Sequence, residues 1–175
     1  WVCLVIIAPL TGVAWYNLVA NDTHGGVIWL ITSLACLALY VHALTVTQNS
    51  FISYLLIGSF VSSIQSAVLI LDSPAYGYAW GLVIAGLVLS VVTRLRGYTL
   101  DFNKSSEISS QLLTPLSILG SIALLPQHGS LQLSVTLLLS GVYYALLAWW
   151  NPEQRINYTF TAQYPWLNCF TAAAW

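Results

Sequence analysis

Charged side chains are scarce in this sequence: Lys, Arg, Asp and Glu together make up 5% of its 175 residues. An ordinary soluble domain carries about 25% charged residues, and its water-facing surface depends on them. The shortage of charge therefore excludes a soluble globular domain. The chain has only 4 Lys and Arg residues, too few to hold a phosphate backbone, so we expect no nucleic-acid partner.

Cysteine and recognisable catalytic motifs are also scarce. The 3 cysteines, Cys3, Cys36 and Cys169, lie in apolar runs without a CxxC pair, which is typical of small buried side chains rather than of redox centres. The sequence contains no glycine-rich phosphate loop and no Ser-His-Asp arrangement. We therefore identify no catalytic residue and expect no cofactor.

Long uncharged apolar segments fill most of the chain instead. A helix rises about 1.5 Å per residue and the hydrocarbon core of a bilayer is roughly 30 Å thick, so about 20 apolar residues span it. Six segments meet this length: residues 1–20, 27–46, 51–71, 76–93, 108–126 and 131–150. A shorter apolar run, 164–175, reads as a truncated seventh span. We predict an all-α fold, a polytopic transmembrane helical bundle that forms a single domain over residues 1–175.

The links between these segments set the expected arrangement. Short links rich in turn-forming residues predict antiparallel neighbours and hence a bundle of helical hairpins. They cover residues 21–26, 47–50, 72–75 and 127–130. Residues 94–107 and 151–163 are expected to form two longer loops.

The basic residues predict an orientation, because cytoplasmic loops retain Lys and Arg. Arg94, Arg96 and Lys104 lie between the fourth and fifth spans, and Arg155 lies after the sixth. Counting spans places both links on one side, so we expect that side, and the first residue, to be cytoplasmic.

Aromatic residues lie near the predicted span ends, where amphipathic rings favour the headgroup level. The alternative is that they line a ligand cavity. Those assigned to the outer boundary are Trp15, Tyr16, Trp29, Tyr76, Tyr78 and Trp80, and those assigned to the inner boundary are Tyr40, Phe51, Tyr54, Tyr98, Trp149, Trp150, Tyr158 and Trp166.

Small residues recur at every fourth position in the third and fourth spans. Such stripes allow two helices to approach closely, and an interhelical hydrogen bond in a membrane adds roughly 0.6 kcal/mol. We expect the two stripes to face each other and Gly81→Leu to separate the helices. The stripes consist of Gly58, Ser62 and Ser66 in one span and Gly77, Gly81 and Ala85 in the other.

Polar groups that could carry chemistry are few. Asn17 and Gln65 are amides within predicted spans and could belong to a polar path, although an amide there more often bonds a neighbouring helix. On the expected outer side, two imidazoles and two carboxylates could bind a divalent metal such as zinc, but they lack a diagnostic spacing and equally suit solvated loops. These four residues are Asp22, His24, Asp72 and His128.

Spans two, four and six begin at residues 27, 76 and 131, so similar units recur about every 50 residues. The clearest similarity joins LACLALYVHAL (34–44) to LLSGVYYALLA (138–148). Both segments end in aromatic, small and aliphatic residues before a polar link, and this ending resembles the repeated hairpins of large repeat-built polytopic bacterial membrane proteins of unknown function. The resemblance implies a location in a bacterial inner membrane and no established activity.

Trp1 in place of Met and the apolar end of the chain lead us to expect a fragment of a longer chain, whose remainder and the lipid bilayer are its partners. The favoured function is a structural or anchoring membrane segment. The alternative is a permease or flippase-like segment with a path along span three, lined by Asn17, Ser62, Ser63, Gln65 and Ser66 and gated near Pro115. A membrane enzyme using Asp22 or Asp72 as its acid is a third reading.

Overall fold

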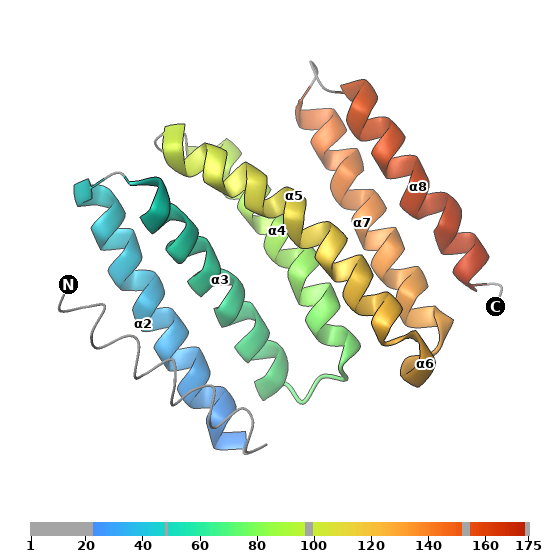
Figure 1. Ribbon diagram of the computed structural model, residues 1–175, viewed down its shortest axis with the longest axis horizontal. Helices are drawn as coiled ribbons and strands as arrows, with labels where there is room; N and C mark the ends of the chain where they lie inside the picture. Colours follow the sequence, from blue (N-terminus) through green and yellow to red (C-terminus); the bar gives the residue numbers. More distant parts are fainter. Residues whose placement is uncertain (1–22, 48, 97–99, 152–154, 174–175) are drawn as a thin grey trace. The chain divides into compact units, whose positions relative to one another are not determined.

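The computed structural model describes residues 23–47, 49–96, 100–151 and 155–173, and within them the regular structure is entirely helical, without a β-strand (Figure 1). The helices are α2 (Thr23–Thr47), α3 (Ser50–Ile70), α4 (Tyr76–Arg96), α5 (Leu100–Ala123), α6 (Leu125–His128), α7 (Ser130–Trp150) and α8 (Arg155–Ala173). The all-α prediction is therefore confirmed for this part of the chain.

The chain divides into two compact units, which are described separately. Unit one contains α2, α3 and the start of α5 as far as Ser109. Unit two contains α4 as far as Arg94, the rest of α5 from Ser110, and α6, α7 and α8.

Four helices of the described residues are long and apolar enough to cross a membrane, with mean hydropathies between 1.6 and 2.1. They are α2 from Gly25, α3, α4 as far as Arg94, and α7. Membrane integration is thus supported by length and composition. The first predicted span, 1–20, lies outside the described residues, and α5 and α8 are more polar, so the count of six spans and a seventh stays a prediction.

Both predicted long loops are wrong in part, because helices begin inside them. Helix α5 starts at Leu100 and α8 at Arg155, and each continues without interruption into the apolar segment that follows. Residues 23–26, predicted as a link, likewise form the first turn of α2. Hydropathy predicts which residues lie in the hydrocarbon core of a bilayer. A helix can extend beyond that core into the polar interface, because its backbone hydrogen bonds are formed within the helix.

Local chemistry explains where several helices begin and end. The Asn49 side chain caps α3 by accepting a hydrogen bond from the Phe51 backbone N–H at 2.9 Å. At the other end, Asp72 adopts a left-handed conformation (φ 48°), and the amides of Asp72 and Ser73 bond back to the carbonyls of Leu69 and Val68. This is a Schellman ending, which satisfies carbonyls that would otherwise be unpaired.

Within unit one, α2 and α3 pack side by side and run in opposite directions (Figure 1). The Trp29 indole N–H donates to the Ser62 hydroxyl at 2.7 Å, and Ser62 and Ser33 share a further hydrogen bond of 2.8 Å. Near the other end of α3, the Gly26 backbone lies against Leu69 and Ile70, where an added Cβ would come within 3.1 Å of Ile70. The pair is therefore joined by polar contacts and by close contact of the Gly26 backbone with side chains of α3.

Within unit two, α7 packs along α8, and α6 forms the short turn that leads into α7 (Figure 1). Gly129 separates α6 from α7 with φ 77°, a conformation that favours glycine. The apolar core combines Val83 of α4 with residues of α7 and α8. Its buried members are Val83, Tyr143, Leu147, Ala148 and Tyr158.

Candidate functional site

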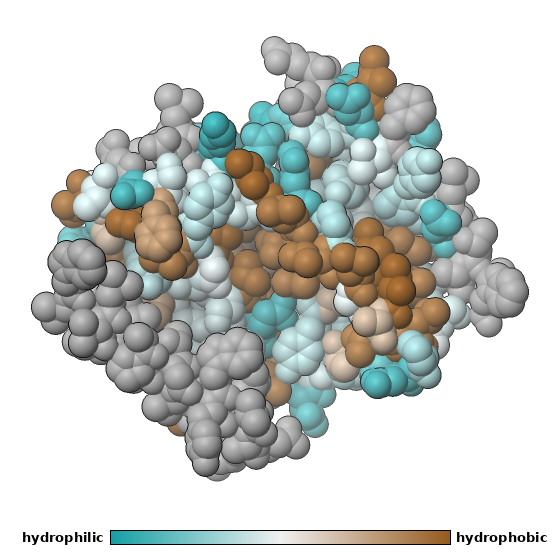
Figure 2. Space-filling view, viewed as in Figure 1, coloured by the Kyte–Doolittle hydropathy of each residue, from teal (hydrophilic) through white to brown (hydrophobic). Residues whose placement is uncertain are grey.

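Helix α5 is polar on its buried face and apolar on its exposed face. The buried face carries hydroxyl side chains that are at most 1% exposed: Ser106, Ser110, Thr114, Ser117 and Ser121. The opposite face carries aliphatic side chains that are between 40% and 62% exposed: Ile108, Leu112, Leu116, Leu119 and Ile122. In Figure 2 a hydrophobic band follows the course that α5 takes in Figure 1. A helix of a soluble protein shows the reverse pattern.

The hydroxyl face of α5 meets α4 and α7 at a cluster centred on Thr136, which we call the Thr136 cluster. Its members are Thr136 and Gln132 of α7, Ser121 of α5 and Trp80 of α4. The Thr136 and Ser121 hydroxyl oxygens are 2.7 Å apart, and the Trp80 indole N–H donates to Thr136 at 3.2 Å. The Gln132 amide N–H donates to the Ser121 carbonyl at 2.8 Å. Three helices are thus joined by side-chain hydrogen bonds.

The direction of the bonds in this cluster follows from the single hydrogen on each hydroxyl. Thr136 donates its hydrogen to the Gln132 carbonyl, one turn earlier, at 2.9 Å. Ser121 must then be the donor in its bond to Thr136. The Thr136 oxygen therefore donates once and accepts twice, from Ser121 and Trp80, so its hydrogen-bonding capacity is filled.

A second contact between α5 and α4 lies next to the cluster. The Ser117 hydroxyl donates to the Ala79 carbonyl at 2.7 Å. Gly86 allows α4 to approach α5 closely, because an added Cβ would lie 3.3 Å from the Ser110 carbonyl and 3.8 Å from the Thr114 hydroxyl. The hydroxyl face of α5 therefore packs directly on the α4 backbone.

Toward the opposite end of α7, aromatic side chains make a second junction. The Gln111 amide of α5 donates to the Tyr158 hydroxyl of α8 at 2.9 Å. Tyr143 is fully buried, and its ring centroid lies 5.1 Å from that of Tyr144, with the two rings edge-on. This junction adds α8 to the helices that α5 contacts.

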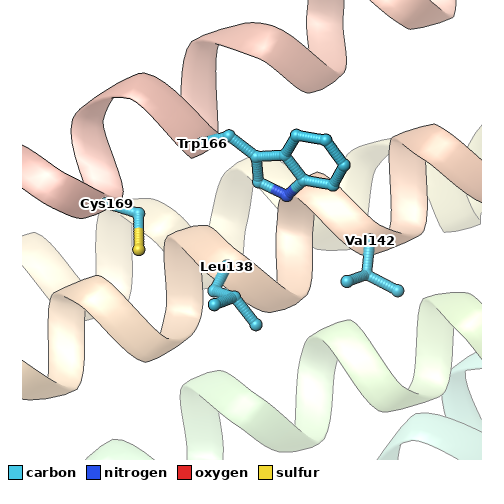
Figure 3. Close-up of a pocket in the computed structure, with 4 residues that line it drawn as sticks. All are labelled: Leu138, Val142, Trp166 and Cys169. Atoms are coloured by element: carbon cyan, nitrogen blue, oxygen red, sulfur yellow. The ribbon is translucent and has the colours of Figure 1, made fainter.

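An apolar groove lies between α7 and α8, with a volume of about 310 Å³. Leu138 and Val142 of α7 and Trp166 and Cys169 of α8 line it (Figure 3). The Trp166 indole lies directly against Gly141, leaving no room for a Cβ there. We call this feature the α7–α8 groove.

The predicted small-residue stripes are only partly placed. Ser62 bonds to α2 through Trp29 and Ser33, and the space around Gly58 is open for an added Cβ. Ser66 is buried and bonds to the Ser63 carbonyl of its own helix. Gly77, Gly81 and Ala85 are buried on α4. The stripes lie in different units, so their pairing stays a prediction.

The predicted polar path also remains a prediction. Asn17 lies outside the described residues, and Gln65 is half-buried on α3. The hydroxyls beside it are already engaged, since Ser63 bonds to the Ser59 carbonyl and Ser62 to α2. Pro115, the proposed gate, lies within the continuous helix α5.

The outer metal cluster is not assembled by the described residues, where no group of three or more suitable side chains occurs. Asp22 and the side chain of His24 are outside that part of the structure. Asp72 ends α3 in a Schellman turn, and the His128 ring packs edge-on against Tyr76 at 5.5 Å. Each of these two residues therefore has a local packing role.

Several of the aromatic side chains predicted at the membrane boundary also contact other helices. Trp29 and Trp80 donate hydrogen bonds to other helices, and Tyr158 is a core residue with 8% exposure. Phe51 and Trp149 are exposed near helix ends, as an interfacial position requires.

The hydroxyl face of α5 was not among the features predicted from the sequence. The signal was present, since hydroxyl residues at 106, 110, 114, 117 and 121 follow a helical period of three and four. Hydropathy averaged along the segment does not separate the two faces of the helix, so these hydroxyls do not stand out as a group.

No protein-family model, no curated protein and no solved structure matches this chain.

Proposed function

We propose that this chain is an integral membrane segment with a structural, anchoring role. In this proposal it crosses the bilayer six times and begins a seventh crossing, as antiparallel hairpins, with its first residue in the cytoplasm. The resemblance to repeat-built bacterial membrane proteins supports a bacterial inner membrane. Its partners are the lipid bilayer and the remainder of a longer chain.

The main support for this proposal is that α5 buries its hydroxyl side chains and exposes its aliphatic ones, the opposite of a helix in a soluble protein. Its exposed aliphatic face would be unfavourable in water, whereas lipid tails are as apolar as the side chains they contact. Its hydroxyl face would be unfavourable against lipid and is covered by α4 and α7. This arrangement supports α5 as a membrane span even though its first turns are polar.

The use of the buried polar groups supports a structural role over a chemical one. Ser117, Ser121 and Thr136 bond to other helices, so their hydroxyls hold helices together. Hydroxyls elsewhere bond to carbonyls one turn earlier, as Ser140 does to Thr136. Carboxylate and basic side chains, the groups on which ion-coupled carriers and proton relays depend, are absent from α7 and from α4 before Arg94.

A second candidate, a permease or flippase-like segment, is favoured by one observation. The Thr114 hydroxyl and the side-chain amide oxygen of Gln132 (Oε1) are buried and have no hydrogen-bond partner among the described residues. Buried polar atoms of this kind can bind water, and a chain of such waters would form a hydrated path.

Reconstitution of the chain into phosphatidylcholine vesicles separates the two candidates. The structural proposal expects the chain to resist alkaline extraction and the vesicles to swell in glycerol or urea no faster than empty vesicles. Faster swelling that Thr114→Val and Gln132→Leu abolish, with Ser134→Ala as a control that alters only a bond within α7, would establish the permease instead. Release of the chain by alkaline extraction would contradict both.

A further inference from the structure

We propose that the α7–α8 groove is a binding site for one acyl chain of a membrane lipid. This inference rests on the proposed function in one respect, namely that α7 lies in a bilayer. It goes further by assigning a ligand class to a particular set of side chains.

The chemistry of the lining selects an apolar ligand. Leu138, Val142 and the Trp166 ring present hydrocarbon to the groove, and Cys169 is a small, nearly buried side chain that behaves as a weakly polar hydrophobe (Figure 3). A headgroup, an ion or a sugar would lose its hydration there without gaining hydrogen bonds. A hydrocarbon chain has no hydration or hydrogen bonds to lose there and gains close contact.

The size of the groove suits a section of one chain. Its volume of about 310 Å³ is at the lower limit of small-ligand pockets, which begin near 300 Å³. An apolar cavity of roughly half that volume, about 150 Å³, already admits benzene. The groove therefore has room for a linear run of methylene groups.

The depth of the groove identifies the source of the ligand. Leu138 and Val142 flank residue 140, the middle of helix Ser130–Trp150, so the groove lies at the centre of a bilayer-spanning helix. Both are partly exposed, at 49% and 38%. At that depth the surrounding medium consists of the ends of lipid acyl chains.

Gly141 gives the groove its shape. Because residue 141 has no side chain, the Trp166 indole lies directly against α7 and forms one wall, with Cys169 one helical turn further along α8. An aromatic wall and branched aliphatic side chains on the opposite helix form a cleft rather than the smooth surface of a single helix. Lipid in this cleft has contacts on two sides, whereas lipid on an ordinary helix face has them on one.

Helix α5 offers a matched surface for comparison. The Ser121–Thr136 bond places these residues at one level, and α5 and α7 run in opposite directions, so Leu119 is level with Leu138 (Figure 1). Leu116 and Leu119 are 53% and 62% exposed, more than the groove residues. They report ordinary contact with lipid at the same depth.

The test uses the whole chain in phosphatidylcholine vesicles that contain a trace of phosphatidylcholine with a diazirine at the end of one acyl chain. After illumination, labelled peptides are mapped by mass spectrometry. We expect labelling at Leu138 and Val142 to exceed that at Leu116 and Leu119 several-fold. Cys169→Phe or Val142→Phe, which fill the groove, should reduce the excess to the α5 level, whereas Leu116→Phe and Cys169→Ser should preserve it.

Equal labelling of the two surfaces in a chain that resists alkaline extraction would overturn the groove proposal and leave the membrane proposal intact. Loss of labelling at the groove together with crosslinks between two copies through Leu138→Cys would also overturn it, because a second chain would then fill the cleft. Extraction of the chain from the vesicles would overturn both proposals.

Discussion

Single side chains decide how the helices of unit two are joined, and Thr136 is the clearest case. Its hydroxyl accepts from Ser121 of α5 and Trp80 of α4 while donating to its own helix. No other position in the Thr136 cluster bonds to two other helices through one atom. Thr136 therefore concentrates several weak interactions at one point.

Thr136→Val should lower the free energy of unfolding by about 1–2 kcal/mol. The variant keeps the side-chain shape but removes two interhelical bonds of about 0.6 kcal/mol each and leaves the Trp80 N–H unsatisfied. Unfolding in mixed detergent micelles measures the change. Thr161→Val is the matched control, because Thr161 is exposed and bonds only within α8. Equal stability of the two variants would show that the cluster contributes nothing.

Gly141 allows α7 and α8 to pack closely, because the Trp166 indole lies against it. Gly141→Ala places a methyl group where the Trp166 indole lies and should cost about 1–3 kcal/mol through overpacking. Gly120→Ala faces open space and should be neutral or stabilising by up to about 1 kcal/mol, since alanine favours the helix. Thermal unfolding of both variants measures the contrast. If the indole is the cause, Gly141→Ala should cost less in a Trp166→Ala background.

At the scale of whole elements, α5 is the helix whose environment is least obvious from its composition. Its first turns carry Lys104 and Glu107, both exposed, and its later turns separate hydroxyl from aliphatic side chains. Averaged hydropathy hides this separation, because the buried serine residues lower the mean of a segment whose exposed large side chains are mainly leucine and isoleucine. Polarity by face is therefore the better guide to its location.

Nitroxide labels on α5 test that location. Labels at Leu112, Leu116 and Leu119 in vesicles should be relaxed strongly by oxygen, which concentrates in lipid, and weakly by a water-soluble nickel complex. A label at Lys104, in the polar first turns, should show the reverse preference. Access of the nickel complex along the whole aliphatic face would mean that α5 lies in water, against the membrane assignment.

For the whole molecule, the expected topology makes a prediction about sides. If the basic residues mark the cytoplasmic face, cysteines substituted at Lys104 and Arg155 should react with an impermeant maleimide from one side of the membrane, and a cysteine at Gln127 from the other. Native cysteines are first replaced by alanine. Reaction of Lys104→Cys and Arg155→Cys from opposite sides would mean that an odd number of spans lies between them. That result would contradict the predicted topology, which places two spans there.

The sequence predicted the helical class and the approximate position of five helices, because long uncharged runs have few alternatives. It failed at the starts of α5 and α8, where a helix passes from the polar interface into the apolar segment without a change in hydrogen bonding. It also did not identify which side chains bond across helices: the Ser62 hydroxyl bonds to Trp29 and Ser33 of α2, a contact that the spacing of residues within α3 does not reveal. Pairing depends on helix rotation, which spacing along one helix does not fix.

By itself the sequence determined that this chain is helical and suited to lipid, since backbone polar groups in uncharged segments must be satisfied within each helix. Only the tertiary structure decided what the polar side chains do. Hydroxyls on α5 and α7 bond to one another and to α4, Trp166 lies against Gly141, and an apolar groove forms beside them. The reason is physical: composition sets the preferred solvent of a segment, whereas the partner of each side chain depends on how neighbouring helices are rotated and how closely they approach.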